Sequence, residues 1–119
     1  MKSLGEFTNY LVAQLQDQDI NFNLRNKRKI HEFFYFLKTE THEKPSFIDR
    51  LCFDWDNSYP KSPKLADHIN ALHGFVCVPN YEGLLKLDEE VAKRWQEQAK
   101  SLDSDYLIHA VSLAKEYFS

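Results

Sequence analysis

Residues 62–87, SPKLADHINALHGFVCVPNYEGLLKL, carry the pattern that decides the predicted fold. Ser62 before Pro63 is a strong helix start. Serine caps the first turn, and proline at the first helical position lacks an N–H that would be unpaired there. The helix is predicted to end at Gly74, in the left-handed conformation that closes many helices. Its predicted buried stripe consists of Leu65, Ile69 and Leu72.

Short apolar runs at residues 75–78 and 84–87 flank the turn signal at 79–83, and they predict a β-hairpin. A helix that runs directly into a hairpin is typical of a winged helix-turn-helix. In that interpretation the helix before Gly74 is the recognition helix, and residues 75–87 are the wing.

Apolar spacings of three and four predict helices on both sides of this unit. The first follows a capping box at Ser3 and Glu6. The second covers about 24–38, with Asn23 as its cap. The stripe at 47–55 predicts a third helix, with a strand as the alternative. The predicted buried residues of the first two helices are Leu4, Phe7, Leu11, Leu15, Ile30, Phe33, Phe34 and Leu37.

Two further helices are predicted at the C-terminal end, one capped by Asp88 and one by Asp103 or Ser104. Their apolar faces consist of Val91, Ala92, Trp95 and Ala99, and of Leu107, Ala110, Val111, Ala114 and Phe118. The predicted fold class is therefore mainly α with one small β-hairpin, built as a winged-helix-like core with extra N- and C-terminal helices.

The chain has 119 residues, of which 43% are hydrophobic and 28% charged. This predicts a single domain over residues 1–119. No apolar stretch approaches the ~20 residues that span a bilayer, and the N-terminus lacks the apolar segment of about 7–15 residues of a secretory signal. We therefore expect a cytoplasmic protein. Cys52 and Cys77 lie in apolar contexts and are expected to be buried and reduced, with a disulfide as the alternative.

No pattern typical of a catalytic or cofactor site is found. Asp54 and Asp56 form an Asp-x-Asp pair, whose carboxylate oxygens can bind Mg²⁺ or Ca²⁺. Polar residues of a turn are the simpler interpretation. His68 and His73 are five residues apart on a helix, a rotation of about 140°, so they do not share a face. We predict no catalytic residue, no metal and no cofactor.

The net charge of −3 is the sum of two opposed regions. Residues 24–44 hold six basic and three acidic side chains, whereas residues 81–119 hold eight acidic and five basic ones. Within the basic region, Phe33 to Phe36 are four consecutive aromatic residues. Successive helical side chains point about 100° apart, so these four rings cannot all face one core. Tyr35 or Phe36 must therefore face another element or solvent.

Two segments resemble the Panacea-domain family of small prokaryotic proteins and its winged-helix relatives. They are RKIHEFFYFLK at 28–38 and NSYPKSPKLADHINALHGFV at 57–76, and the resemblance covers roughly residues 28–95. The Gly-Pro-Tyr loop of the family is replaced here by Ser58-Tyr59-Pro60. The resemblance implies a non-enzymatic protein that neutralises or delivers a partner protein, as an antitoxin or adaptor does.

The favoured hypothesis is therefore binding of a partner protein, because exposed aromatics beside basic residues are typical of interface hot spots. The predicted partner-binding residues are Arg25, Arg28, Lys29, Tyr35 and Phe36. The alternative is a winged-helix DNA-binding regulator, although its groove-facing surface holds few cations. The DNA-binding residues would then be Lys64, His68 and Lys86. A homo-oligomer is compatible with either hypothesis, and no membrane partner is expected.

Overall fold

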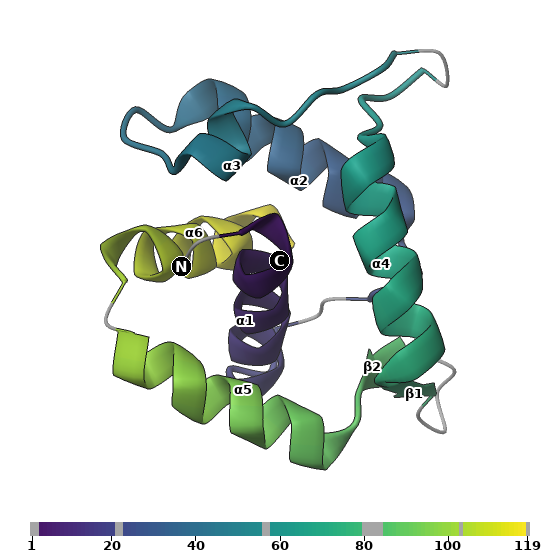
Figure 1. The fold of residues 1–119 in the computed structure, drawn as a ribbon, viewed down its shortest axis with the longest axis vertical. Coiled ribbons are helices and arrows are strands. Elements are labelled where there is room, and N and C mark those ends of the chain that lie inside the picture. Colours follow the sequence, from purple (N-terminus) through teal and green to yellow (C-terminus); the bar gives the residue numbers. More distant parts are fainter. Residues whose placement is uncertain (1–2, 21–22, 56–57, 80–84, 103, 119) are drawn as a thin grey trace.

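The computed structural model describes residues 3–20, 23–55, 58–79, 85–102 and 104–118, which form a mainly helical fold (Figure 1). In chain order, the described elements are α1 (Leu4–Asp17), α2 (Lys27–Glu40), α3 (Ser46–Asp49), α4 (Pro63–Phe75), β1 (Cys77–Pro79), β2 (Leu85–Leu87), α5 (Glu89–Leu102) and α6 (Asp105–Tyr117).

Helix α1 is the central element, and α5 and α6 pack against it (Figure 1). Ser3 Oγ accepts a hydrogen bond from the Glu6 N–H (3.2 Å), which is the first half of the predicted capping box. The predicted stripe is buried, with Phe7, Leu11 and Leu15 fully inaccessible to solvent. Because α1 lies between the other helices, its apolar face forms the middle of the hydrophobic core.

The first correction concerns the start of α2. The predicted cap was Asn23, whereas the observed cap is Asn26, whose Oδ1 accepts from the Lys29 N–H (3.3 Å). Leu24 is buried in the turn before the helix, and its carbonyl accepts a hydrogen bond from His73 (2.6 Å). Burial of Leu24 and this contact with α4 hold the chain in a turn where periodicity alone predicted helix.

The second correction concerns the segment 47–55, because α3 is a single turn and the predicted helix does not continue. The chain instead becomes extended, and Asp54 and Lys61 pair as an isolated antiparallel bridge with hydrogen bonds of 2.8 and 2.9 Å. In extended chain, alternate side chains share one face. Phe53 and Trp55 both lie against Tyr35 of α2, and helical spacing would not place them on one side.

Helix α4 begins as predicted, with Ser62 Oγ accepting from the Leu65 N–H (3.2 Å) and Pro63 in the first turn. Its end differs from the prediction. The helix continues through Gly74 to Phe75, and Gly74 does not adopt the left-handed conformation. The Val76 N–H caps it by bonding to the carbonyl of Leu72 (3.1 Å). A helical glycine needs no positive φ when the next residue ends the helix.

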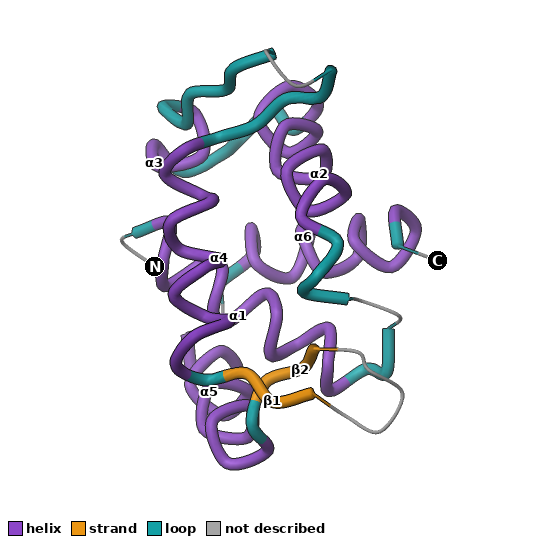
Figure 2. Tube along the Cα trace, turned by 90° about the vertical axis from the view of Figure 1, so that its right-hand side faces the viewer, coloured by secondary structure: helices purple, strands orange, loops and turns teal. Residues whose placement is uncertain are grey.

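Strands β1 and β2 pair antiparallel, directly after α4 (Figure 2). They begin later than the predicted strands, with Cys77 opposite Leu87, and most of the predicted turn lies outside the described residues. The Gln16 side chain of α1 continues the ladder. Its Oε1 accepts from the Leu87 N–H (3.0 Å), and its Nε2 donates to the Leu87 carbonyl (3.2 Å). One side chain therefore takes the place of a third strand.

The last two helices follow the predicted caps. The Val91 N–H bonds to Asp88 Oδ2 (3.4 Å) at the start of α5, and Ser104 caps α6 through the Leu107 N–H (3.3 Å). All five apolar residues predicted for the face of α6 are buried. Of the face predicted for α5, Ala92 and Ala99 are buried, and the two larger side chains are half-buried.

The buried His31 ties α2 to the start of α4, because its Nδ1 accepts the Ser62 N–H (3.1 Å). Burial, together with the nearby cations Lys61 and Lys27, lowers the pKa of His31 to about 4. The folded state therefore holds the neutral ring, whereas the unfolded chain protonates near pH 6.5. The stabilisation is complete above the unfolded pKa and is lost as the pH falls toward the folded pKa.

We predict that acidification from about pH 7 to pH 5 lowers the free energy of unfolding by about 2 kcal/mol through His31, because the ring is protonated in the unfolded chain and stays neutral in the folded one. In urea unfolding, His31→Gln should show a clearly smaller dependence on pH. Some dependence should persist, because burial also lowers the pKa of His68. The control His42→Gln removes an exposed ring and should keep the wild-type dependence. An unchanged dependence in His31→Gln would contradict this account.

We predict that Gln16→Leu destabilises the fold by about 1–3 kcal/mol, because two backbone groups of Leu87 lose their partner. Amide hydrogen exchange should accelerate first at Leu87. Gln18→Leu, at an exposed position on the same helix end, is the matched control and should leave that amide unaffected. Equal exchange rates of the Leu87 amide in both variants would show that the Gln16 side chain does not stabilise β2.

Candidate protein-binding surface

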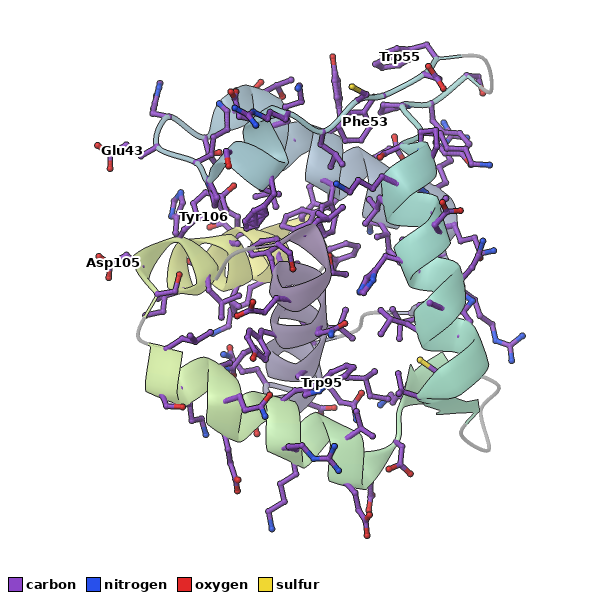
Figure 3. The ribbon with its side chains drawn as sticks, viewed as in Figure 1. Glu43, Phe53, Trp55, Trp95, Asp105 and Tyr106 are labelled. Carbon is purple, nitrogen blue, oxygen red and sulfur yellow. The ribbon has the colours of Figure 1, made fainter. Side chains whose placement is uncertain are left out.

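An aromatic surface lies on the outer side of α2, formed by Tyr35, Phe53 and Trp55. The Tyr35 ring lies edge-on to both other rings, with centroid distances of 5.3 Å to Phe53 and 5.3 Å to Trp55. Trp55 is 58% exposed, and Figure 3 shows it at the outer edge of the molecule, with Phe53 nearer to α2. We call these three residues the aromatic surface.

A cation lies on the same side of α2. Arg28, Glu32 and Tyr35 are spaced at i, i+4 and i+7, so they share one face of the helix. The Arg28 Nε is 3.5 Å from Glu32 Oε1, and its guanidinium carbon is 5.5 Å from the centroid of Tyr59. An exposed ion pair of this kind contributes little to stability. The Arg28 side chain therefore contacts Glu32 and Tyr59 but remains 61% exposed.

The remaining predicted partner-binding residues on α2 belong to a different face. Lys29 Nζ lies 5.5 Å from the ring of Phe118, and Phe36 lies 5.8 Å from Tyr117. Arg25 precedes the helix and is exposed. The structure thus brings Arg28 and Tyr35 together and separates them from Lys29 and Phe36, because the helix turns by about 100° per residue.

The four consecutive aromatics divide as their helical spacing requires. Phe33 and Phe34 are buried, while Tyr35 and Phe36 are half-buried against other elements. Tyr35 contacts the 53–55 segment, and Phe36 stacks with Phe33 and lies tilted against Tyr117. The expectation that Tyr35 or Phe36 faces another element is confirmed for Tyr35, whereas Phe36 packs partly buried against the core.

Sequence reasoning missed the contribution of Phe53 and Trp55, because the segment was interpreted as a third helix, with Trp55 in its buried stripe and Phe53 outside it. One signal in the sequence could have found them. Phe53, Asp54 and Trp55 alternate apolar, polar and apolar, and this alternation is typical of a strand. It supports the strand that the sequence left open as the alternative to a helix. Their contact with Tyr35 follows from the extended conformation of this segment.

The three residues predicted for DNA contact differ in their exposure and contacts. Lys64 is exposed in the first turn of α4, and Lys86 is half-buried in β2 opposite Val78. His68 Nε2 lies 2.9 Å from Asn9 Oδ1, and burial lowers the pKa of His68. Its ring is therefore neutral at pH 7, and Lys64 and Lys86 are the two cations of this set.

The cysteines and histidines do not converge on a reactive centre. Both thiols are free, but Cys52 is exposed, contrary to the prediction that it is buried. Its short helix ends at Asp49, which leaves the side chain on an extended surface segment. Cys77 is half-buried, and burial raises the pKa of its thiol to about 11. A thiol with so high a pKa is a poor nucleophile at neutral pH.

His68 and His73 contact different elements, α1 and the turn before α2, as their spacing predicts. Of the two aspartates considered as a cation site, Asp54 forms a backbone bridge with Lys61, and Asp56 lies outside the described residues. Across the described ranges, no group of three or more His, Cys, Asp or Glu side chains could hold a metal ion. None of the described helices is long and apolar enough to cross a membrane.

Comparison of the chain with models of protein families, with curated proteins and with solved structures found no match.

We predict that Trp55→Ala changes the free energy of unfolding by less than about 1 kcal/mol, because the side chain is largely exposed. Phe33→Ala should cost about 3–5 kcal/mol, since that ring is fully buried. Urea unfolding of both variants at one pH measures the difference. A large loss of stability in Trp55→Ala would mean that this ring serves the core and not a surface.

Proposed function

We propose that this protein is a non-enzymatic cytoplasmic module that binds a partner protein through the aromatic surface and Arg28. The observation that carries the proposal is Trp55, whose large ring is 58% exposed although Tyr35 lies directly against it. Tryptophan, tyrosine and arginine are the residues most enriched at interface hot spots. Here all three occur on one side of α2.

The surface is also held in position before any partner binds. The backbone bridge between Asp54 and Lys61 fixes the segment that carries Trp55, and Tyr35 restricts its ring. A partner that binds a preorganised ring does not have to order it, and this raises affinity for the same contacts. The exposed Trp55 is therefore the expected anchor of the interface.

We further propose a winged-helix-like arrangement for the middle of the chain. Support comes from the capped helix α4, which leads directly into the antiparallel pair of β1 and β2. The resemblance to Panacea-domain antitoxins and adaptors agrees with a partner-binding role that needs no catalytic residue. In this proposal the wing is a structural part of the module, tied to α1 by Gln16.

We predict that Trp55→Ala and Arg28→Glu each weaken capture of the partner from cells that produce this protein by at least about tenfold, as expected for hot-spot residues. Quantitative affinity capture with the immobilised full chain measures the effect. Lys29→Glu and Phe36→Ala test the other face of α2, and Lys93→Glu on the exposed side of α5 is the charge-matched control. All three should retain capture.

Loss of capture in Lys29→Glu and Phe36→Ala, with full capture in Trp55→Ala, would overturn the assignment of the surface. The DNA alternative is measured separately with random duplex DNA at low salt. Binding should be weak, because the predicted contact residues supply two cations and most nonspecific affinity comes from phosphate contacts. Tight binding with a steep dependence on salt would overturn the proposal of a partner protein.

A further inference from the structure

A groove with a volume of about 360 Å³ lies between α1, α5 and α6, away from the aromatic surface. Helices α5 and α6 both pack on α1 and diverge from each other (Figure 1), and all three helices contribute residues to the groove. None of its described lining residues comes from α2 or from the 53–55 segment. The described lining residues are Gln14, Gln18, Ala99, Lys100, Ser104, Leu107, Ile108, Val111, Ser112 and Lys115.

The groove combines a buried apolar floor with an exposed apolar rim. Ala99, Leu107 and Val111 are buried and form the floor. Ile108 on the rim is 61% exposed, the largest exposure of any large hydrophobic side chain in the described part of the chain. Leu102, at the nearby end of α5, is 38% exposed. Exposed apolar residues at a groove with a buried apolar floor are typical of a docking site.

The charge of this groove is opposite to that of its surroundings. Residues 81–119 hold eight acidic and five basic side chains, yet the described lining contains two lysines and neither Asp nor Glu. Lys100 and Lys115 are exposed, and within the described ranges neither forms an ion pair. Both lie in the last turn of their helices, where the helix dipole favours a cation in any protein. The absence of carboxylates among the described lining residues is the feature that the dipole does not explain.

The length of the groove favours side chains of a long partner over a complete small ligand. From Ser104 to Lys115 the groove follows α6 for about 17 Å, or three helical turns. Its volume of about 360 Å³ is near the lower end of the ~300–1,000 Å³ of small-molecule sites. It can therefore hold the apolar side chains of one helix face while the rest of that helix stays in solvent.

We propose that this groove is a second docking site, which binds an acidic amphipathic helix of a partner protein. Apolar side chains spaced at i, i+4 and i+7 would lie over Leu107 and Val111 and against Ile108. Carboxylates near the two ends of that helix would pair with Lys100 and Lys115. The site is separate from the aromatic surface, so the protein would hold two partner segments at once, as a delivering adaptor requires.

The test is selection of a displayed library of random peptides of about 12 residues, slightly longer than three helical turns, on the immobilised full chain. Peptides with apolar residues at helical spacing and Glu or Asp near both ends should be enriched. Selected peptides are then synthesised, and their affinities are measured by fluorescence anisotropy. Enrichment of basic peptides, or of none, would overturn the proposal.

Variants of the full chain locate the binding. Ile108→Asp should weaken the selected peptides at least about tenfold, because it places a carboxylate on the apolar rim. Lys100→Glu with Lys115→Glu should weaken them about tenfold, since attraction becomes repulsion at two positions. The matched control is Lys93→Glu with Arg94→Glu, at exposed positions of α5 outside the groove, and it should retain affinity.

Trp55→Ala separates this inference from the proposed function. The affinity of peptides that bind the groove should be unchanged in Trp55→Ala. Selected peptides that lose affinity for Trp55→Ala but keep it for Ile108→Asp would overturn the second site. Analytical ultracentrifugation tests a second copy of this chain as the occupant. Self-association that Ile108→Asp abolishes would replace the proposed partner helix with that second copy.

Discussion

The fully buried ring of Phe7 joins α1 to three other helices. Its centroid lies 5.9 Å from Phe34 of α2, 5.7 Å from Phe47 of α3 and 5.7 Å from Tyr106 of α6. Aromatic contacts of this geometry add about 0.5–1.5 kcal/mol each beyond the area they bury. Because α1 also packs on α5 and β2, the positions of the remaining elements depend on the burial of its apolar face.

The two candidate binding surfaces follow from this packing. Burial of Phe34 against Phe7 sets the rotation of α2, and the next residue, Tyr35, then points outward, where Trp55 covers it. On the other side of the molecule, α5 and α6 both pack on α1 but diverge from each other. Their divergence leaves the rim residue Ile108 exposed beside a buried floor.

Much of the fold could be predicted from local patterns. The stripes of α1 and α6, the Ser62 cap and the order of the elements are confirmed, because helical period and capping act within a few residues. The predictions for the end of α3, the start of α2 and the conformation of Gly74 were wrong. In the first two places a distant contact competes with local preference: Phe53 with Tyr35, and Leu24 with His73.

The sequence by itself determined that α1, α2, α4, α5 and α6 form, which side chains of α1 and α6 are buried, and that four consecutive rings could not all enter one core. These properties depend on spacing along the chain. Only the tertiary structure decided that Trp55 joins Tyr35 on the surface, and that a groove whose described lining holds no carboxylate lies in the acidic region. Such arrangements depend on how separate helices are rotated and spaced, and no short stretch of sequence encodes that geometry.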